Sequence, residues 1–274
     1  MGDGARTADE VVTFYGRGLE RGRLRQGRAR LERARIRSIL ARRLPPPPAS
    51  ILDVGGGPGV HAVWLARRGY DVTLVDPVPL HVDEAAAASA AQPDAPLAGV
   101  ALGDARELSF AAAASVDCLL LFGPLYHLVE RCDRLAALAE ARRVLRPGGL
   151  LFATAISRYA WLLDGLASGR VFVEPGRLDL AAATVESGVL RDANLFTTAA
   201  LHRPGELEDE VRESGFALEE LLGVEGPGWL LEDFDRSWTD HERRAKVLAI
   251  AELVESERDL VAASTHLLAV ARAV

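Results

Sequence analysis

Apolar residues occur along this chain in short continuous runs that alternate with helical patterns. Strands that are apolar on both faces are typical of a parallel sheet with helices on both sides. The pattern therefore predicts an α/β fold with a seven-stranded, mostly parallel sheet. We expect strands at 50–54, 71–75, 99–102, 116–122, 150–155, 216–224 and 266–272, and helices at 59–68, 80–92, 131–145 and 204–214.

The stretch Ile51–Asp76, ILDVGGGPGVHAVWLARRGYDVTLVD, organises the rest of the chain. An apolar run, a glycine cluster, a helical segment and a second apolar run follow one another, and this order predicts a right-handed βαβ unit. Gly55, Gly57 and Gly59 have no Cβ, so a ligand can approach the backbone and the free N–H groups at the helix start. A carboxylate at Asp76 can accept hydrogen bonds from two vicinal hydroxyls, such as those of a ribose.

The spacing of these glycines separates two classes of nucleotide ligand. A dinucleotide-binding turn has the pattern G-x-G-x-x-G, and its third glycine would fall on Val60. The pattern present is D-x-G-x-G-x-G, from Asp53 to Gly59. The turn therefore disfavours a dinucleotide such as NAD.

Residues 1–48 are interpreted as an N-terminal helical arm. A helical pattern covers 7–43, with a capping box at Thr7, and several glycines divide it into two pieces, of which 28–43 is the firmer. Pro45–Pro48 ends the helix and acts as a stiff spacer into the first strand. We expect the arm to lie over the ligand site as a flap.

The remaining residues, 49–274, form the main domain in this interpretation. Two long connections interrupt its pattern, at about 157–200 and 225–264. Long connections at the ligand edge of a sheet are usually lids. We therefore expect the arm and the first insertion to enclose the ligand pocket.

Composition and charge narrow the class of protein. Hydrophobic residues make up 49% of the 274, yet no window approaches the roughly 20 apolar residues of a membrane span. The N-terminus lacks the basic and apolar regions of a signal peptide. A net charge of −7 argues against a nucleic-acid substrate. We expect a cytoplasmic protein, monomeric or homodimeric, that acts on a small molecule and binds neither nucleic acid nor membrane.

Cysteines and histidines give no sign of a metal centre. Cys118 lies in an apolar run and Cys132 among charged residues, so neither suggests a disulfide framework. The six histidines show no paired metal spacing, and we expect no bound metal.

The motif from Asp53 to Gly59, joined to Asp76, resembles motif I and the following acidic residue of the class I S-adenosylmethionine-dependent methyltransferases. The resemblance covers roughly residues 50–224 and 266–272. It implies a Rossmann-like sheet whose last strand runs antiparallel between the fifth and sixth strands, and it implies S-adenosylmethionine as the cofactor.

The resemblance also assigns parts of the cofactor to residues. The glycine turn would cradle the methionyl part, Asp76 the ribose hydroxyls, Asp104 and Ala105 the adenine, and Phe122 and Gly123 would lie beside the sulfonium. On the arm, an arginine could pair with the cofactor carboxylate and a tyrosine could close over it. The candidate cofactor-binding residues are Tyr15, Arg23, Asp53, Gly55, Gly57, Gly59, Asp76, Pro77, Asp104, Ala105, Phe122 and Gly123.

Two residues after the fourth strand are candidates for catalysis. S-adenosylmethionine carries its own activated methyl group, so the protein mainly positions the nucleophile, and a general base helps where that nucleophile is a hydroxyl. His127 is the candidate base or substrate-orienting residue, and Tyr126 a wall of the pocket; the alternative for His127 is packing beneath the lid. The [D/N]-P-P-[Y/F/W] motif of many nucleobase and glutamine methyltransferases is absent at Phe122–Tyr126.

The leading hypothesis is a bacterial methyltransferase that moves a methyl group to an O, N or C atom of a small molecule, for example in secondary metabolism. A non-catalytic cofactor-binding protein of the same fold is the second hypothesis. An NAD-dependent oxidoreductase is the third, and the mismatch at Val60 argues against it.

Overall fold

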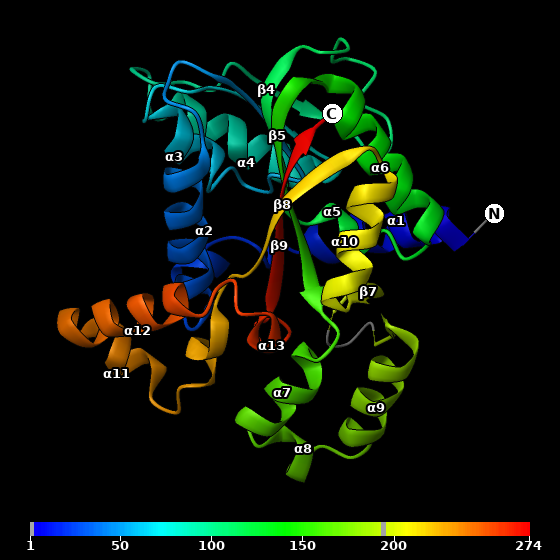
Figure 1. Ribbon diagram of the computed structural model, residues 1–274, viewed down its shortest axis with the longest axis vertical. Coiled ribbons are helices and arrows are strands. Elements are labelled where there is room, and N and C mark those ends of the chain that lie inside the picture. Colours follow the sequence, from blue (N-terminus) through cyan, green and yellow to red (C-terminus); the bar gives the residue numbers. More distant parts are fainter. Residues whose placement is uncertain (1–2, 193–195) are drawn as a thin grey trace.

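The computed structural model describes residues 3–192 and 196–274, which fold around one mixed β-sheet (Figure 1). Within these residues the sheet has nine strands: β1 (Ser50–Val54), β2 (Asp71–Asp76), β3 (Gly99–Leu102), β4 (Val116–Leu121), β5 (Leu145–Ser157), β6 (Val189–Leu190), β7 (Ala199–His202), β8 (Phe216–Gly223) and β9 (His266–Ala273). Their order is β3-β2-β1-β4-β5-β7-β6, with β9 beside β5 and β8 beside β9. The strands β1 to β5 run parallel, and β9 is antiparallel to β5 and β8, which confirms the predicted fold class.

Helices cover both faces of this sheet. They are α1 (Asp3–Tyr15), α2 (Ala29–Arg43), α3 (Ala62–Ala66), α4 (Pro79–Ala90), α5 (Pro124–His127), α6 (Arg131–Val144), α7 (Ala160–Ala167), α8 (Arg170–Val173), α9 (Arg177–Ser187), α10 (Pro204–Glu213), α11 (Phe234–Thr239), α12 (His241–Leu253) and α13 (Arg258–Val261), with 3-10 turns η1 (Arg23–Arg25) and η2 (Gly226–Leu230). In Figure 1, α2, α3 and α4 lie on one side of the sheet and α6 and α10 on the other, while α7 to α9 lie at the end towards which β5 points. Across the described part of the chain, none of the helices has the length and apolar character needed to cross a membrane.

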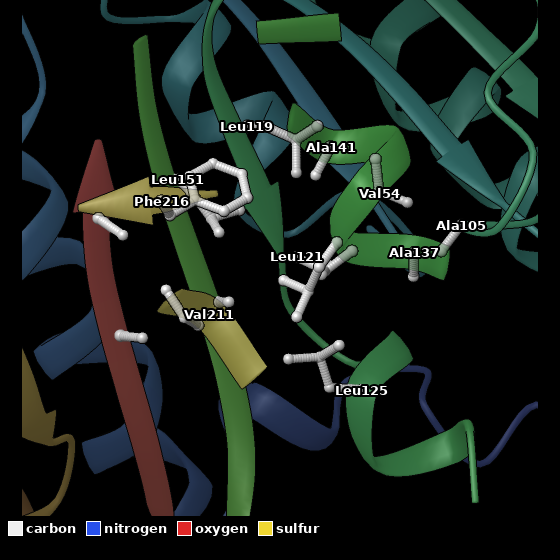
Figure 2. Close-up of a cluster of buried hydrophobic side chains, with 14 of the residues drawn as sticks. Val54, Ala105, Leu119, Leu121, Leu125, Ala137, Ala141, Leu151, Val211 and Phe216 are labelled. Carbon is white, nitrogen blue, oxygen red and sulfur yellow. The ribbon is translucent and has the colours of Figure 1, made fainter. Parts of the chain in front are cut away.

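Aliphatic side chains fill the space on each side of the strands. Figure 2 shows one side, where Leu119 and Leu121 of β4 lie with Ala137 and Ala141 of α6 in one buried cluster. On the other side, Ile39 of α2 belongs to a cluster with residues of the central strands. The continuous apolar runs of the sequence are therefore buried on both faces, as predicted for a parallel sheet.

A hairpin that the sequence prediction missed adds two strands to the seven expected. β6 and β7 pair in antiparallel fashion, and Ile156 of β5 pairs with Leu201 of β7. β6 has only two residues, too few to show an alternating pattern. The hairpin extends the sheet past the end of β4 and brings the first insertion against β5.

Two further predictions of local structure are wrong. β5 begins at Leu145, which pairs with Val116, so residues 146–149 (RPGG), left between the expected helix 131–145 and the expected strand 150–155, lie inside the strand. The first helix begins at Asp3, so Thr7 lies within the helix and cannot cap its N-terminus. Neither difference moves the strand ends that carry the candidate site.

The second half of the arm is part of the core. Leu31 of α2 packs in a small cluster with Trp229 and Trp238 of the second insertion. Arg35 is fully buried, donates to the carbonyl oxygen of Val224 at 3.2 Å and pairs with the carboxylate of Glu255. The many arginines of the arm are typical of a solvated helix face, but Arg35 is an exception. These contacts fix α2, the second half of the arm, against the main domain.

Candidate active site

A cavity of about 600 Å³ lies at the carboxyl edge of the sheet, where ligands bind in open α/β folds. Its wall includes the glycine turn after β1, the ends of β2 and β4, the arm and the first insertion. Of the 14 candidate residues, Gly59 is absent from the wall, and the other 13 line it: Tyr15, Arg23, Asp53, Gly55, Gly57, Asp76, Pro77, Asp104, Ala105, Phe122, Gly123, Tyr126 and His127. Residues as far apart in sequence as Tyr15 and His127 thus meet in one space.

The three glycines of the turn serve different purposes. All have positive φ, +73° at Gly55, +56° at Gly57 and +81° at Gly59. A Cβ on Gly55 would lie 2.7 Å from the ring of Pro124, and a Cβ on Gly59 would lie 3.4 Å from Ala85 and Val63. A Cβ on Gly57 would meet only the Cγ of Glu20, at 3.9 Å. Gly57 is therefore the position at which the missing side chain leaves cavity space open for a ligand.

Asp53 is a buried carboxylate at the cavity wall. It is 1% exposed, it lines the cavity, and neither side-chain oxygen has a hydrogen-bond partner among the described residues. Burial, with the nearby Asp76 carboxylate, raises the pKa of Asp53 to about 7. A buried charge of this kind is stable only with a counter-charge, so Asp53 is suited to a cationic ligand.

Asp76, the last residue of β2, links the end of that strand to the glycine turn by a hydrogen bond. Its Oδ2 accepts from the backbone N–H of Gly57 at 2.8 Å, while Oδ1 accepts from the N–H of Val78 at 2.9 Å and lies 3.0 Å from Nδ1 of His81. The side chain is thus held rigidly at the cavity wall, and it supports the turn as well as facing the ligand space.

We expect Asp76→Ala to weaken S-adenosylmethionine binding about tenfold or more. The variant loses charge-assisted hydrogen bonds worth roughly 1.5–3 kcal/mol and also the support of Gly57. Calorimetric titration measures the affinity, and circular dichroism checks the fold. Asp71→Ala, at the exposed first position of the same strand, is the matched control. Equal affinities for the two variants would contradict the assignment of Asp76.

At the end of β3, Asp104 is engaged by a neighbouring arginine. Its carboxylate accepts from Nε and Nη2 of Arg106 at 3.0 and 2.7 Å and from the Arg106 backbone N–H at 2.8 Å. Burial would raise the pKa of Asp104, but these hydrogen bonds outweigh it and lower the pKa. Ala105, beside it, is buried at the cavity wall. The adenine-binding role of this segment remains a prediction.

His127 joins the arm to the first insertion. Its Nε2 lies 3.1 Å from the Tyr15 hydroxyl and its Nδ1 lies 3.0 Å from Oγ1 of Thr197, so both ring nitrogens are engaged. Burial lowers the pKa of His127 to about 3. The rings of Tyr126 and Phe196 lie 4.6 and 5.5 Å from the imidazole. These contacts agree with the alternative interpretation of His127, packing beneath a lid. The role of His127 as a general base stays a prediction.

Arg23 is also engaged within the arm. Nε donates to Glu20 at 2.7 Å, and the two terminal nitrogens donate to Glu32 at 2.7 and 3.1 Å. Burial would raise the pKa of Glu32, but the Arg23 guanidinium outweighs it and lowers the pKa to about 2. Arg23 lines the cavity, and its pairing with a cofactor carboxylate remains a prediction.

Three cavity residues that sequence reasoning did not select lie together. One side-chain nitrogen or oxygen of each of Glu32, Glu225 and His266 lies within 4.8 Å of those of the other two. They come from α2, the segment after β8 and the first position of β9. His266 could have been found from the expected topology, because an antiparallel last strand begins at the ligand edge. The expectation of no metal stays a prediction.

Comparison with known proteins places this arrangement in a family. The profile of a methyltransferase domain matches residues 51–149. A ubiquinone biosynthesis O-methyltransferase of Methylobacterium nodulans is 30% identical over 181 residues, which cover 60% of this chain and 67% of that protein. The chain belongs to the class I S-adenosylmethionine-dependent methyltransferases.

Other members of the methyltransferase family show how far the likeness extends. An uncharacterised methyltransferase of Mycobacterium tuberculosis is 36% identical over 124 residues, 44% of this chain and 46% of that protein. The chain thus spans about half the length of the first curated methyltransferases it matches. A methyltransferase structure from Methanosarcina mazei has a TM-score of 0.57 at 20% identity, over 85% of this chain and 96% of that one, which shows the shared fold.

The residues present fit S-adenosylmethionine, the cofactor of this methyltransferase family. The cofactor carries two cationic groups, an ammonium and a sulfonium, and Asp53 offers a buried carboxylate that accepts no hydrogen bond from any residue that the structure describes. Gly57 leaves room beside the backbone, and Asp76 ends the next strand at the same edge. The assignment of individual parts of the cofactor to these residues remains a prediction.

Proposed function

We propose that this chain is an enzyme that transfers the methyl group of S-adenosylmethionine to a small-molecule acceptor at an O, N or C atom. The observation that carries the proposal is the shared cavity, in which Asp53 and the glycine turn face the same space as the arm and the first insertion. S-adenosylmethionine supplies an electrophilic methyl group when it is bound. The protein's part is then to hold two ligands in line and to exclude water.

The arm and the first insertion cover the cavity, as the exclusion of water requires. The ring of Phe14 lies 5.8 Å from that of Phe196, and the carboxylate of Glu10 accepts from the backbone N–H of Thr198 at 2.7 Å. These contacts join the two covering segments to each other. A net charge of −7 supports a small-molecule acceptor over a nucleic acid, and we retain the cytoplasmic location as part of the proposal.

Relatives indicate which acceptor atom to test first. Two are named as O-methyltransferases, the ubiquinone biosynthesis enzyme and a malonyl-[acyl-carrier protein] O-methyltransferase of Methylococcus capsulatus, which is 35% identical over 156 residues, 53% of this chain and 55% of that protein. Both names favour oxygen among the three atoms proposed.

The test has two stages. Calorimetric titration should show binding of S-adenosylmethionine and none of NAD; the reverse result would return the chain to the oxidoreductase hypothesis. Incubation with a panel of hydroxyl, amine and carbon acceptors should then release S-adenosylhomocysteine together with a methylated product. Cofactor binding without turnover over the whole panel would favour a non-catalytic protein of the same fold.

A further inference from the structure

Glu225 and His266 form a fixed pair at the cavity wall. Nδ1 of His266 lies 2.6 Å from Oε1 of Glu225. Oε2 of the same carboxylate accepts from the Ser264 hydroxyl at 2.8 Å and from the backbone N–H of His266 at 2.9 Å. Glu225 is 2% exposed. Ser264 and the backbone of His266 thus hold the Glu225 carboxylate in place, and the carboxylate in turn fixes the orientation of the imidazole before any ligand binds.

The other ring nitrogen of His266 is available to a ligand. No hydrogen-bond partner for Nε2 lies among the described residues, and both members of the pair line the cavity. His266 is opposite Ile156, near the carboxyl end of β5, which places it at the ligand edge of the sheet. His127, by contrast, has both ring nitrogens engaged.

The pair lines the same cavity as Phe122 and Gly123, which the family resemblance places beside the sulfonium. The ring of His61, two residues after Gly59 of the glycine turn, lies 5.8 Å from that of Phe122 at the end of β4. β4 and β9 pair with opposite edges of β5: Leu121 of β4 is opposite Ala153, and His266 of β9 is opposite Ile156, so the end of β4 and the start of β9 lie at the same edge of the sheet. A molecule contacting Nε2 of His266 is thus within the space that also borders the end of β4.

The charges around His266 favour its cationic form. Burial would lower its pKa, but the carboxylates of Glu225 and Glu32 outweigh burial and the opposing charge of Arg23, and they raise the pKa to about 9. An imidazolium pairs best with an acceptor that is itself readily ionised. A phenol, with a pKa of about 10, meets this condition, and an aliphatic alcohol is a far weaker acid.

We propose that His266, oriented by Glu225, binds an acceptor of the phenol class through its hydroxyl and holds it as the oxyanion. The inference rests on the proposed function and adds the substrate class. The hydroxyl proton leaves to solvent as the oxyanion pairs with Nε2–H. In the transfer, the acceptor oxygen forms the new bond to the methyl carbon, the S–CH₃ bond breaks and its electron pair stays on sulfur. His266 keeps its proton throughout and touches the reacting oxygen.

The first test uses 4-nitrophenol, whose visible spectrum distinguishes the phenol from the phenolate. With S-adenosylhomocysteine bound and the pH below the probe's own pKa, the wild-type protein should bind the probe as phenolate. His266→Asn should weaken this binding at least tenfold and remove the phenolate spectrum. Glu225→Gln should have the same effect to a smaller degree. His241→Gln, an exposed histidine on α12, should behave as wild type.

The second test follows the imidazole itself. With ¹³C-labelled histidine, one NMR resonance of the wild type should titrate near pH 9, disappear in His266→Asn and move to lower pH in Glu225→Gln. This measurement needs neither cofactor nor turnover. If His266→Asn does not fold, the shift of this titration to lower pH in Glu225→Gln tests the inference in its place.

Several outcomes would overturn the inference. They are a probe bound in its neutral form, equal binding by wild type and His266→Asn, and a phenolate signal lost with EDTA and restored by Mg²⁺, which would assign the oxyanion to a metal. A wild-type protein that binds S-adenosylhomocysteine but no phenol also overturns it. Failure to bind S-adenosylhomocysteine would instead refute the proposed function, so the two failures are distinguishable.

Discussion

Asp53→Asn is expected to weaken S-adenosylmethionine binding at least a hundredfold while making the free protein more stable at pH 8. The cofactor brings a cation to a buried carboxylate that has no other partner among the described residues. Removing one member of a buried ion pair typically costs about 3–5 kcal/mol. Calorimetric titration measures the binding, with Asp71→Asn, an exposed acid of β2, as the control.

The stability effect of Asp53→Asn follows from the pKa of Asp53. Its folded-state value of about 7 is above the ordinary 3.8, so the folded protein holds this proton more tightly than the unfolded chain does. Stability therefore falls as pH rises from about 4 through 7, and the full penalty, roughly 4 kcal/mol at most, is present above pH 7. Asparagine removes this penalty, and thermal unfolding at pH 8 should show a higher Tm.

The same pKa gives cofactor binding a pH dependence. The cation requires the ionised carboxylate, so the affinity should fall about tenfold for each pH unit below 7 and level off above it. Asp53→Asn should bind weakly at every pH without this slope. An affinity of the wild type that is constant between pH 5 and 8 would show that the cation lies away from Asp53.

Gly57→Val should abolish cofactor binding and leave the sheet folded. At φ +56° a β-branched residue is strained, and its side chain would extend into the space in front of the turn, where Glu20 Cγ at 3.9 Å is the closest atom. Gly148→Val separates strain from obstruction, because Gly148 also has a positive φ of +78°, a Cβ there would meet no atom within 4 Å, and the residue lies away from the cavity. We expect Gly148→Val to lose stability and to keep its affinity. Normal binding by Gly57→Val would place the cofactor elsewhere.

The sequence predicted the central strands and the glycine turn well because their signals are local. Continuous apolar runs fix β1 to β4, and the turn after β1 needs glycine at positions of positive φ. The short β6 and the early start of β5 escaped prediction because pairing with distant strands, not local pattern, determines them.

The same distinction applies to the site. Asp53 and Asp76 could be selected because both belong to one local sequence pattern: Asp53 begins the glycine motif, and Asp76 ends the strand that follows it. Glu225 and His266 belong to no such motif, and they meet through the antiparallel placement of β9 beside β5. His127 was selected by its place after β4, and the arm and the first insertion were expected to enclose the pocket, but the individual contacts of His127 with Tyr15 and Thr197 follow from side-chain packing that no sequence pattern reveals.

The contact of the arm with the first insertion bears on how fast ligands are exchanged. Phe14 and Tyr15 reach Phe196 and His127, and this junction spans part of the cavity wall. Each such ring contact contributes about 0.5–1.5 kcal/mol. Because these contacts must break before a ligand can enter or leave, they slow ligand exchange by roughly one to two orders of magnitude. The spent nucleoside is therefore expected to stay bound for longer than an open cavity would allow, and substitutions at Phe14 should shorten its residence time while weakening the hold on both ligands.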